Sequence, residues 1–142
     1  MSQDQQQPLL QVSDLKICIG QGSNATEAVK GISLEKSQGE TIAVVGESGS
    51  GKSVTALSLI RLIPSPPVSY PTGSILFKGQ DLLKANERDL RNIRGSQIAY
   101  VFQEPGTSLN PVFTVGHQIA EAIHLHRPEV KDVQAEIIEA LD

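Results

Sequence analysis

The order of hydrophobic and polar positions predicts strands in the first part of the chain. Residues 9–19 alternate loosely between apolar and polar side chains, and residues 28–34 are apolar at Val29 and at two later positions, so each stretch predicts a strand. Residues 41–45 differ, because they form a β-branched run without polar interruption. Such a run is typical of a strand that is buried on both faces. Two strands ahead of a buried one predict a small antiparallel layer beside an α/β core.

Helical patterns become more frequent after residue 53. Residues 54–63 carry apolar side chains on more than one face and contain no Gly or Pro, which predicts a buried helix that ends before Pro64. A Pro-rich connection follows this helix. The remaining elements that we expect are a strand at 73–79, a polar helix at 85–94 with a solvated charged face, a second buried strand at 98–102, and helices at 114–126 and 130–141.

A glycine-rich loop stands between the first buried strand and the first helix. It reads GESGSGKS and has the form G-x-x-x-x-G-K-[ST], which requires a strand before it and a helix after it. Its glycines let successive backbone N–H groups turn toward an anion, and the start of the helix adds further donors. Lys52 can reach the β- and γ-phosphates of a nucleotide, and the hydroxyl of Ser53 suits Mg²⁺. The loop therefore predicts a nucleotide-phosphate site formed by Gly46, Glu47, Ser48, Gly49, Ser50, Gly51, Lys52, Ser53 and Val54.

Composition narrows the classes of function. The 142 residues suit one domain with a real core, and their net charge of −4 without a Lys/Arg-rich run gives no general attraction to nucleic acid or anionic lipid. The single cysteine, Cys18, excludes an internal disulfide and is expected to be a small apolar strand residue in a reducing compartment. Residues 1–8 are polar and Gln-rich, so we expect a disordered N-terminus without a secretory leader. No apolar run is long enough to span a bilayer, and we expect a cytoplasmic protein.

Three features together resemble the ATP-binding subunit of an ABC transporter. They are the glycine-rich loop, the apolar run at 98–102, and Gln103 directly after that run. The sequence that begins at Gln103, QEPGTSLNP, is similar to the corresponding sequence in the ATPases of dipeptide, oligopeptide and nickel importers. Within this branch, residues 54–58 and 65–68 most resemble the microcin C or glutathione-type members.

The resemblance covers residues 9–142 and implies a P-loop NTPase core of the ABC ATPase type. This core would include an antiparallel β layer and the start of a helical subdomain. The implied function is the ATP-binding component of an importer for peptides or related small solutes, which couples ATP binding and hydrolysis to transport.

The resemblance also implies ATP and Mg²⁺ as ligands and gives individual residues a role. Lys52 would stabilise charge on the γ-phosphoryl group. Ser53 and Gln103 would ligate Mg²⁺, and Gln103 would also sense the attacking water. Ile19 falls where family members usually stack the adenine on an aromatic residue, so it offers apolar contact without π-stacking. A second departure is Gly106, where most relatives are expected to have Met.

Partners are implied in the same way. The segment after Gln103, through the helix that starts near Phe113, would contact the coupling helix of a transmembrane permease. A second ATPase domain would be the dimer partner and would oppose the loop. The chain would then lie on the cytoplasmic face of the bacterial inner membrane without inserting into it.

Several motifs of the family cannot be found, namely the LSGGQ-type signature, the Walker B carboxylates and the switch histidine. We therefore expect the N-terminal part of a nucleotide-binding domain, and ATP hydrolysis by this chain is uncertain. One alternative is a truncated module that binds ATP or the permease without hydrolysis, and another is a P-loop kinase or other phosphotransferase. The resemblance further implies that the strands at 41–45 and 98–102 are not neighbours, so that both would have unpaired edges.

Overall fold

The computed structural model describes residues 7–141, which form two compact units. The first unit extends to Arg94 and the second begins at Gly95. All strands of the described residues belong to the first unit, and the second is helical. Of the stretch predicted to be disordered, residues 1–6 lie outside the described part of the chain, so disorder there stays a prediction.

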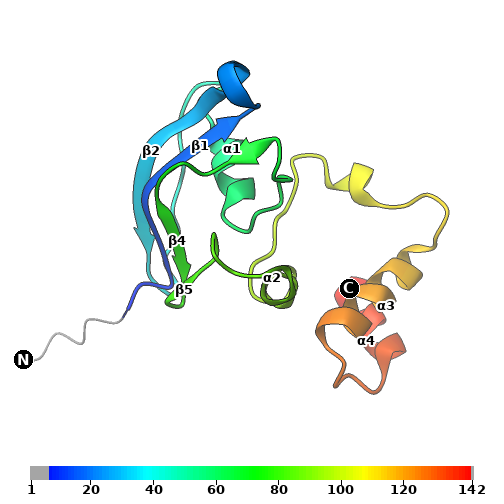
Figure 1. The fold of residues 1–142 in the computed structure, drawn as a ribbon. Coiled ribbons are helices and arrows are strands. Elements are labelled where there is room, and N and C mark those ends of the chain that lie inside the picture. The colour runs from blue at the N-terminus through cyan, green and yellow to red at the C-terminus, as the bar shows by residue number, and fades with distance from the viewer. Residues whose placement is uncertain (1–6, 142) are drawn as a thin grey trace, which may run out of the picture. The chain divides into compact units, whose positions relative to one another are not determined.

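The first unit is built on a five-stranded sheet in which every pairing is antiparallel (Figure 1). The strands lie in the order β2-β1-β4-β5, and β3 pairs with the end of β1. This sheet confirms the predicted antiparallel layer. Its strands are β1 (Leu10–Ile19), β2 (Thr26–Lys36), β3 (Val68–Ser69), β4 (Ser74–Phe77) and β5 (Gln80–Asp81), and a 3-10 turn, η1 (Gly22–Asn24), joins β1 to β2.

β1 is the central strand and supplies much of the core of this unit. Leu15 and Ile17 are fully buried, and their cross-strand partners on β2 are Ile32 and Val29. The polar residues of β1 alternate with these apolar ones and are less buried, which is the pattern of a sheet with one face covered. Cys18 lies on β1 and is half-buried, as expected of a strand residue.

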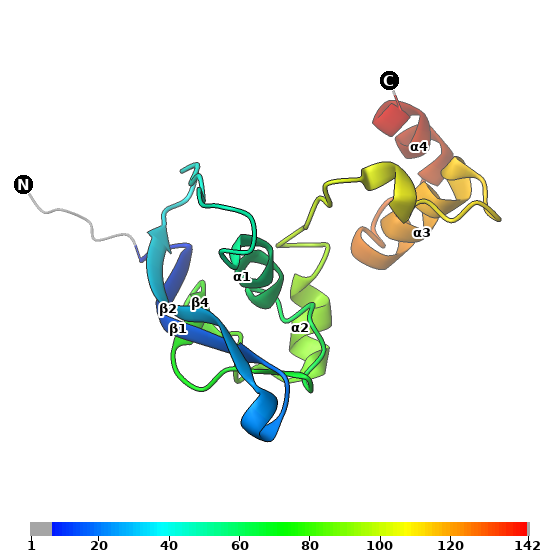
Figure 2. The ribbon, with the colours of Figure 1, turned by 90° about the horizontal axis from the view of Figure 1, so that it is seen from above.

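Two helices complete the first unit. α1 (Lys52–Ser58) lies within the curve of the sheet and contacts β2, as Figure 2 shows. α2 (Glu87–Ile93) buries Leu90 and Ile93 and is capped by Asn86, whose side chain accepts a hydrogen bond from the backbone N–H of Asp89 at 2.9 Å.

One charge at the end of α2 departs from the predicted solvated face. Arg94 donates to the backbone carbonyls of Ile60 and Arg61, each at 2.8 Å, and pairs with Glu87. Its side chain is 22% exposed. This arginine therefore ties the end of α2 to the turn that follows α1.

The second unit contains η2 (Pro105–Ser108), α3 (Val115–His126) and α4 (Val133–Leu141). The hydroxyl of Thr114 accepts a hydrogen bond from the backbone N–H of His117 and caps the start of α3. α3 and α4 contact each other, each burying one isoleucine, and Arg127 pairs with Glu136 across the turn between them. These contacts make the two helices a helical hairpin.

The two predicted buried strands are wrong. Residues 41–45 have no strand structure, and 98–102 have none beyond an isolated bridge at Ile98. Val45 is 91% exposed and Val101 is 83% exposed. The physical reason is pairing: among residues 7–141 no strand lies beside either run, so backbone N–H and C=O groups stay with solvent and the chain remains irregular.

The predicted helix at 54–63 is correct in kind but not in extent. α1 begins at Lys52 and ends at Ser58, and Arg61 has φ = 51°, a left-handed conformation through which a helix cannot continue. The N–H of Leu62 donates to the carbonyl of Leu57 at 2.9 Å and closes the helix end. The Pro-rich connection that follows contains β3. The other predicted strands and helices are confirmed, with bounds that differ by up to three residues.

Candidate functional site

The glycine-rich loop at 46–53 runs directly into α1, as predicted. Gly49 and Gly51 have φ values of 81° and 90°, a conformation that residues with a side chain rarely adopt. The N–H of Ser50 donates to the carbonyl of Glu47 at 3.2 Å and closes a tight turn. A Cβ on Gly51 would lie 2.7 Å from the carbonyl oxygen of Ala28, so only glycine allows the loop to approach β2 this closely.

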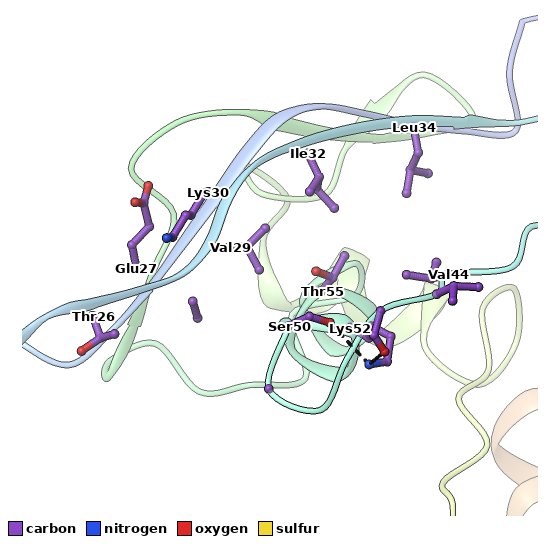
Figure 3. Close-up of a pocket in the computed structure, with 14 residues that line it drawn as sticks. Thr26, Glu27, Val29, Lys30, Ile32, Leu34, Val44, Ser50, Lys52 and Thr55 are labelled. Atoms are coloured by element: carbon purple, nitrogen blue, oxygen red, sulfur yellow. Dashed lines mark hydrogen bonds between the residues drawn. The ribbon is translucent and has the colours of Figure 1, made fainter.

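The side chain of Lys52 lies over the loop. Its Nζ donates to the carbonyl oxygens of Gly46 and Glu47, both at 2.7 Å, and makes a longer contact of 3.4 Å to Ser50 Oγ (Figure 3). An ammonium group has three N–H donors, so two are firmly held and the third is weakly engaged. The backbone carbonyls therefore hold the charge over the loop and leave one donor for an anion.

Backbone donors of the loop add to this charge. Within the described residues, the N–H groups of Ser48, Gly49 and Gly51 have no hydrogen-bond partner in the protein. Residues 46–50 and Ser53 are exposed, and Gly51 is half-buried. Unpaired backbone N–H donors in the same loop as a lysine are typical of glycine-rich loops that bind phosphate. The loop therefore fits a polyphosphate on its own geometry.

A cavity of about 730 Å³ lies between the loop and β2. Figure 3 shows Val29, Ile32 and Leu34 on the side of β2 that faces Lys52 and Thr55 of α1. On the loop side, the cavity extends to Val44 and Val45. Its β2 side is mostly polar at the start of the strand, from Thr26 to Lys30, and apolar further along, at Ile32 and Leu34. The full lining is Thr26, Glu27, Ala28, Val29, Lys30, Ile32, Leu34, Val44, Val45, Gly46, Gly49, Ser50, Lys52 and Thr55.

The structure brings only part of the predicted site together. Within residues 46–53, Gly46, Gly49, Ser50 and Lys52 line the cavity, and Val54 lies half-buried on α1. Ile19 ends β1 and does not line the cavity, although its cross-strand partner Thr26 does. Gln103 belongs to the second unit, where it is exposed along a hollow of about 420 Å³ with Phe102, Glu104 and Ser108. Its role at the metal stays a prediction.

Sequence reasoning missed the β2 side of this cavity. The strand was predicted, but its inward residues were treated only as part of a layer. A signal was present, because the apolar positions 29, 32 and 34 mark the covered face of the strand. The close approach of Gly51 to β2 could not be read from the sequence, since it depends on how the loop folds back.

Comparison with known proteins identifies the family. The family model described as "ABC transporter" matches residues 29–142. The chain belongs to the ABC transporter family. It is 50% identical over 127 residues to the peptidoglycan transport ATP-binding protein YejF of Agrobacterium fabrum, which covers 89% of this chain and 23% of that protein. It is 44% identical over 124 residues to the oligopeptide transport ATP-binding protein OppD of Bacillus subtilis, covering 87% of this chain and 35% of that protein.

A solved structure supports the same fold. This ABC family chain is similar to a dimeric, post-hydrolysis state of the ATP-binding cassette MJ0796 bound to ADP and Pi, with a TM-score of 0.77 at 20% identity. The match covers 93% of this chain and 55% of that one. The predicted fold class, an ABC ATPase core with an antiparallel β layer, is therefore confirmed, as is the resemblance to peptide importers. The chain spans 23% and 35% of the length of the two curated relatives.

The helices of the structure give one further observation on membranes. Across residues 7–141, none is both long enough and apolar enough to pass through a bilayer.

Proposed function

We propose that this chain supplies the ATP-binding part of an ABC importer subunit for peptides or related small solutes. The observation that carries the proposal is the position of Lys52, whose Nζ is held over the loop at 2.7 Å from two carbonyl oxygens and keeps one donor weakly engaged. Together with the free N–H groups of the loop, it would hold the β- and γ-phosphates of ATP. The names of the relatives support peptides as the transported class.

Mg²⁺ would bind beside the phosphates. Ser53 follows Lys52 on the first turn of α1 and is exposed, so its hydroxyl can serve as an oxygen ligand to a hard cation. Gln103 would supply a second oxygen and respond to the attacking water. In the whole subunit, Lys52 and the metal held by Ser53 and Gln103 would neutralise charge on the phosphates during ATP hydrolysis. This hydrolysis would be coupled to transport.

The nucleoside would lie at the end of the sheet beside Ile19. This residue is directly paired with Thr26, and directly paired residues place their side chains on the same face of a sheet. The base would therefore meet an apolar surface without a ring to stack on. We expect weak discrimination between bases, because apolar contact is less selective than hydrogen bonding to a base edge.

A permease would contact the segment between Gln103 and α3. The end of this segment is tied to α3, because Gln118 accepts from the N–H of Asn110 at 2.9 Å and donates to the carbonyls of Asn110 and Phe113 at 3.0 and 3.1 Å. It displays Val112 and Phe113 to solvent, 82% and 52% exposed. A second ATPase domain would face the loop as dimer partner, and the permease would hold the subunit at the cytoplasmic face of the bacterial inner membrane.

Calorimetry with Mg-ATP tests the phosphate site. Lys52→Ala should remove detectable binding, since charge-assisted hydrogen bonds contribute about 1.5–3 kcal/mol each and the loop has no other cation. Lys84→Ala is the matched control, because that lysine is 85% exposed and pairs with Asp81 away from the loop. ATP and GTP should differ in affinity by less than about tenfold, or 1.4 kcal/mol.

The assignment fails if Lys52→Ala binds Mg-ATP as well as the parent does. A loss that Lys84→Ala reproduces would also contradict it, because a general effect of charge would then explain both variants.

A further inference from the structure

The first residue of β2, Thr26, has a side-chain hydroxyl without a partner in the described part of the chain. The residue is exposed and lines the cavity beside the phosphate loop. Its partner across the sheet is Ile19, so the two side chains share a face. A hydroxyl therefore lies next to the apolar residue at this end of the sheet.

The alternation of β2 shows which way Thr26 faces. Glu27 pairs with Cys18, which belongs to the opposite face from Ile19. In Figure 3, Thr26 and Val29 lie toward the side of α1 and the loop, whereas Glu27 extends to the other side of the strand. Both of the strand's first two residues line the cavity, and Thr26 is the one whose side chain lies on the side of α1 and the loop.

The loop reaches β2 close to Thr26. A Cβ on Gly51 would lie 2.7 Å from the carbonyl oxygen of Ala28 and 3.1 Å from Val29 Cγ2. Ala28 is two residues from Thr26, a separation of roughly 6–7 Å along a strand that rises about 3.3 Å per residue. A sugar attached to phosphates on the loop can span this separation.

We propose that Thr26 determines nucleoside affinity by hydrogen-bonding a ribose hydroxyl of the nucleotide, while Ile19 supplies only apolar contact to the base. This inference rests on the proposed function. A threonine hydroxyl can both donate and accept, and so can each ribose hydroxyl, which makes the pairing independent of the base. The pairing would let a site without an aromatic stack still hold the nucleoside of any ribonucleoside triphosphate.

The experiment compares Thr26→Val and Thr26→Ser with the parent chain by calorimetry. Valine keeps the shape and strand preference of threonine and removes the hydroxyl, whereas serine keeps the hydroxyl. Thr41→Val is the matched control, because Thr41 is exposed and does not line the cavity. The ligands are the Mg²⁺ complexes of ATP, GTP, 2′,3′-dideoxy-ATP and inorganic tripolyphosphate.

Thr26→Val should weaken ATP and GTP equally, by about threefold to tenfold, which is the usual net value of one hydrogen bond. Thr26→Ser and Thr41→Val should bind like the parent. Tripolyphosphate and 2′,3′-dideoxy-ATP should not distinguish Thr26→Val from the parent, because neither carries a ribose hydroxyl.

Equal ATP binding by Thr26→Val and the parent would overturn the inference. An equal loss for tripolyphosphate would overturn it as well, since the substitution would then have disturbed the loop itself. If the parent chain binds no tripolyphosphate, the phosphate site of the proposed function fails, and the inference falls with it. Binding of tripolyphosphate together with ATP affinity that is indifferent to Thr26 would reject the inference alone.

Discussion

β1 and residues 41–45 were both predicted to be strands, and they are opposite in structure. Both are rich in Ile and Val, yet Leu15 and Ile17 on β1 are 0% exposed, whereas Val44 and Val45 are 58% and 91% exposed. The difference lies in their neighbours. β1 has β2 along one edge and β3 and β4 along the other, while no strand among residues 7–141 pairs with 41–45.

The comparison shows that a high β propensity makes a segment suitable for a sheet but is not sufficient to form a strand. A β-branched run forms a strand when other chain segments take its backbone hydrogen bonds and cover its side chains. Residues 98–102 of the second unit behave in the same way, because Val101 and Phe102 are exposed. Among the ring contacts of the described residues, the ring of Phe102 contacts only that of Tyr100. The same residues in a paired setting would be core.

The largest expected difference between β1 and residues 41–45 is in the free energy of unfolding after a substitution in each. Leu15→Ala removes a fully buried side chain and should lower the free energy of unfolding by about 2–5 kcal/mol. Val45→Ala, at a 91% exposed position, should change it by less than about 0.5 kcal/mol. Urea denaturation followed by circular dichroism measures both. Equal losses would mean that residues 41–45 are packed in solution.

Amide hydrogen exchange should sharpen the comparison residue by residue. The N–H groups of Leu15 and Ile17 lie in a paired central strand, so their exchange should be at least about a hundredfold slower than that of Ile42, Val44 and Val45. Exchange read by mass spectrometry or NMR gives the ratio. Slow exchange at 42–45 would show that this run has found a strand partner, in a second copy or elsewhere.

The substitution Val45→Lys should change stability least and should change aggregation measurably. Val45→Lys places a charge on an exposed β-branched run, which otherwise offers a template for edge pairing. The free energy of unfolding should move by less than about 0.5 kcal/mol, while the concentration at which the chain aggregates should rise. Light scattering measures this concentration. Lys131→Ala is a suitable comparison, because it changes charge at an exposed position outside this run.

Much of the fold was accessible from the sequence, because its local patterns agree with its tertiary contacts. The alternation at 9–19, the apolar positions at 28–34 and the helical pattern at 114–126 each predict an element that the structure contains. The positions of the loop residues followed from the motif for the same reason, since glycine at 49 and 51 is required by the local backbone. Local chemistry was sufficient for these parts.

The rest depended on contacts that no local pattern reports. The end of α1 at Ser58 is set by the left-handed turn at Arg61 and by the bonds that Arg94 makes to the carbonyls there, from 33 and 34 residues away in the chain. The β2 lining of the cavity follows from the fold-back of Gly51. The failure of the two buried strands has the same origin, because burial is a property of partners as much as of residues.

The two carbonyl oxygens that hold Lys52 belong to the backbone, and this has a consequence for how the site can vary. A substitution at Glu47 leaves its backbone carbonyl in place. The main-chain path therefore sets the position of the Lys52 ammonium group, whatever side chain residue 47 carries. Gly46 has less freedom, because a Cβ there would lie 2.6 Å from Ser50 Oγ, and that hydroxyl would have to move. Two adjacent residues that hold the same lysine through their carbonyls thus differ in how much room they leave for a side chain.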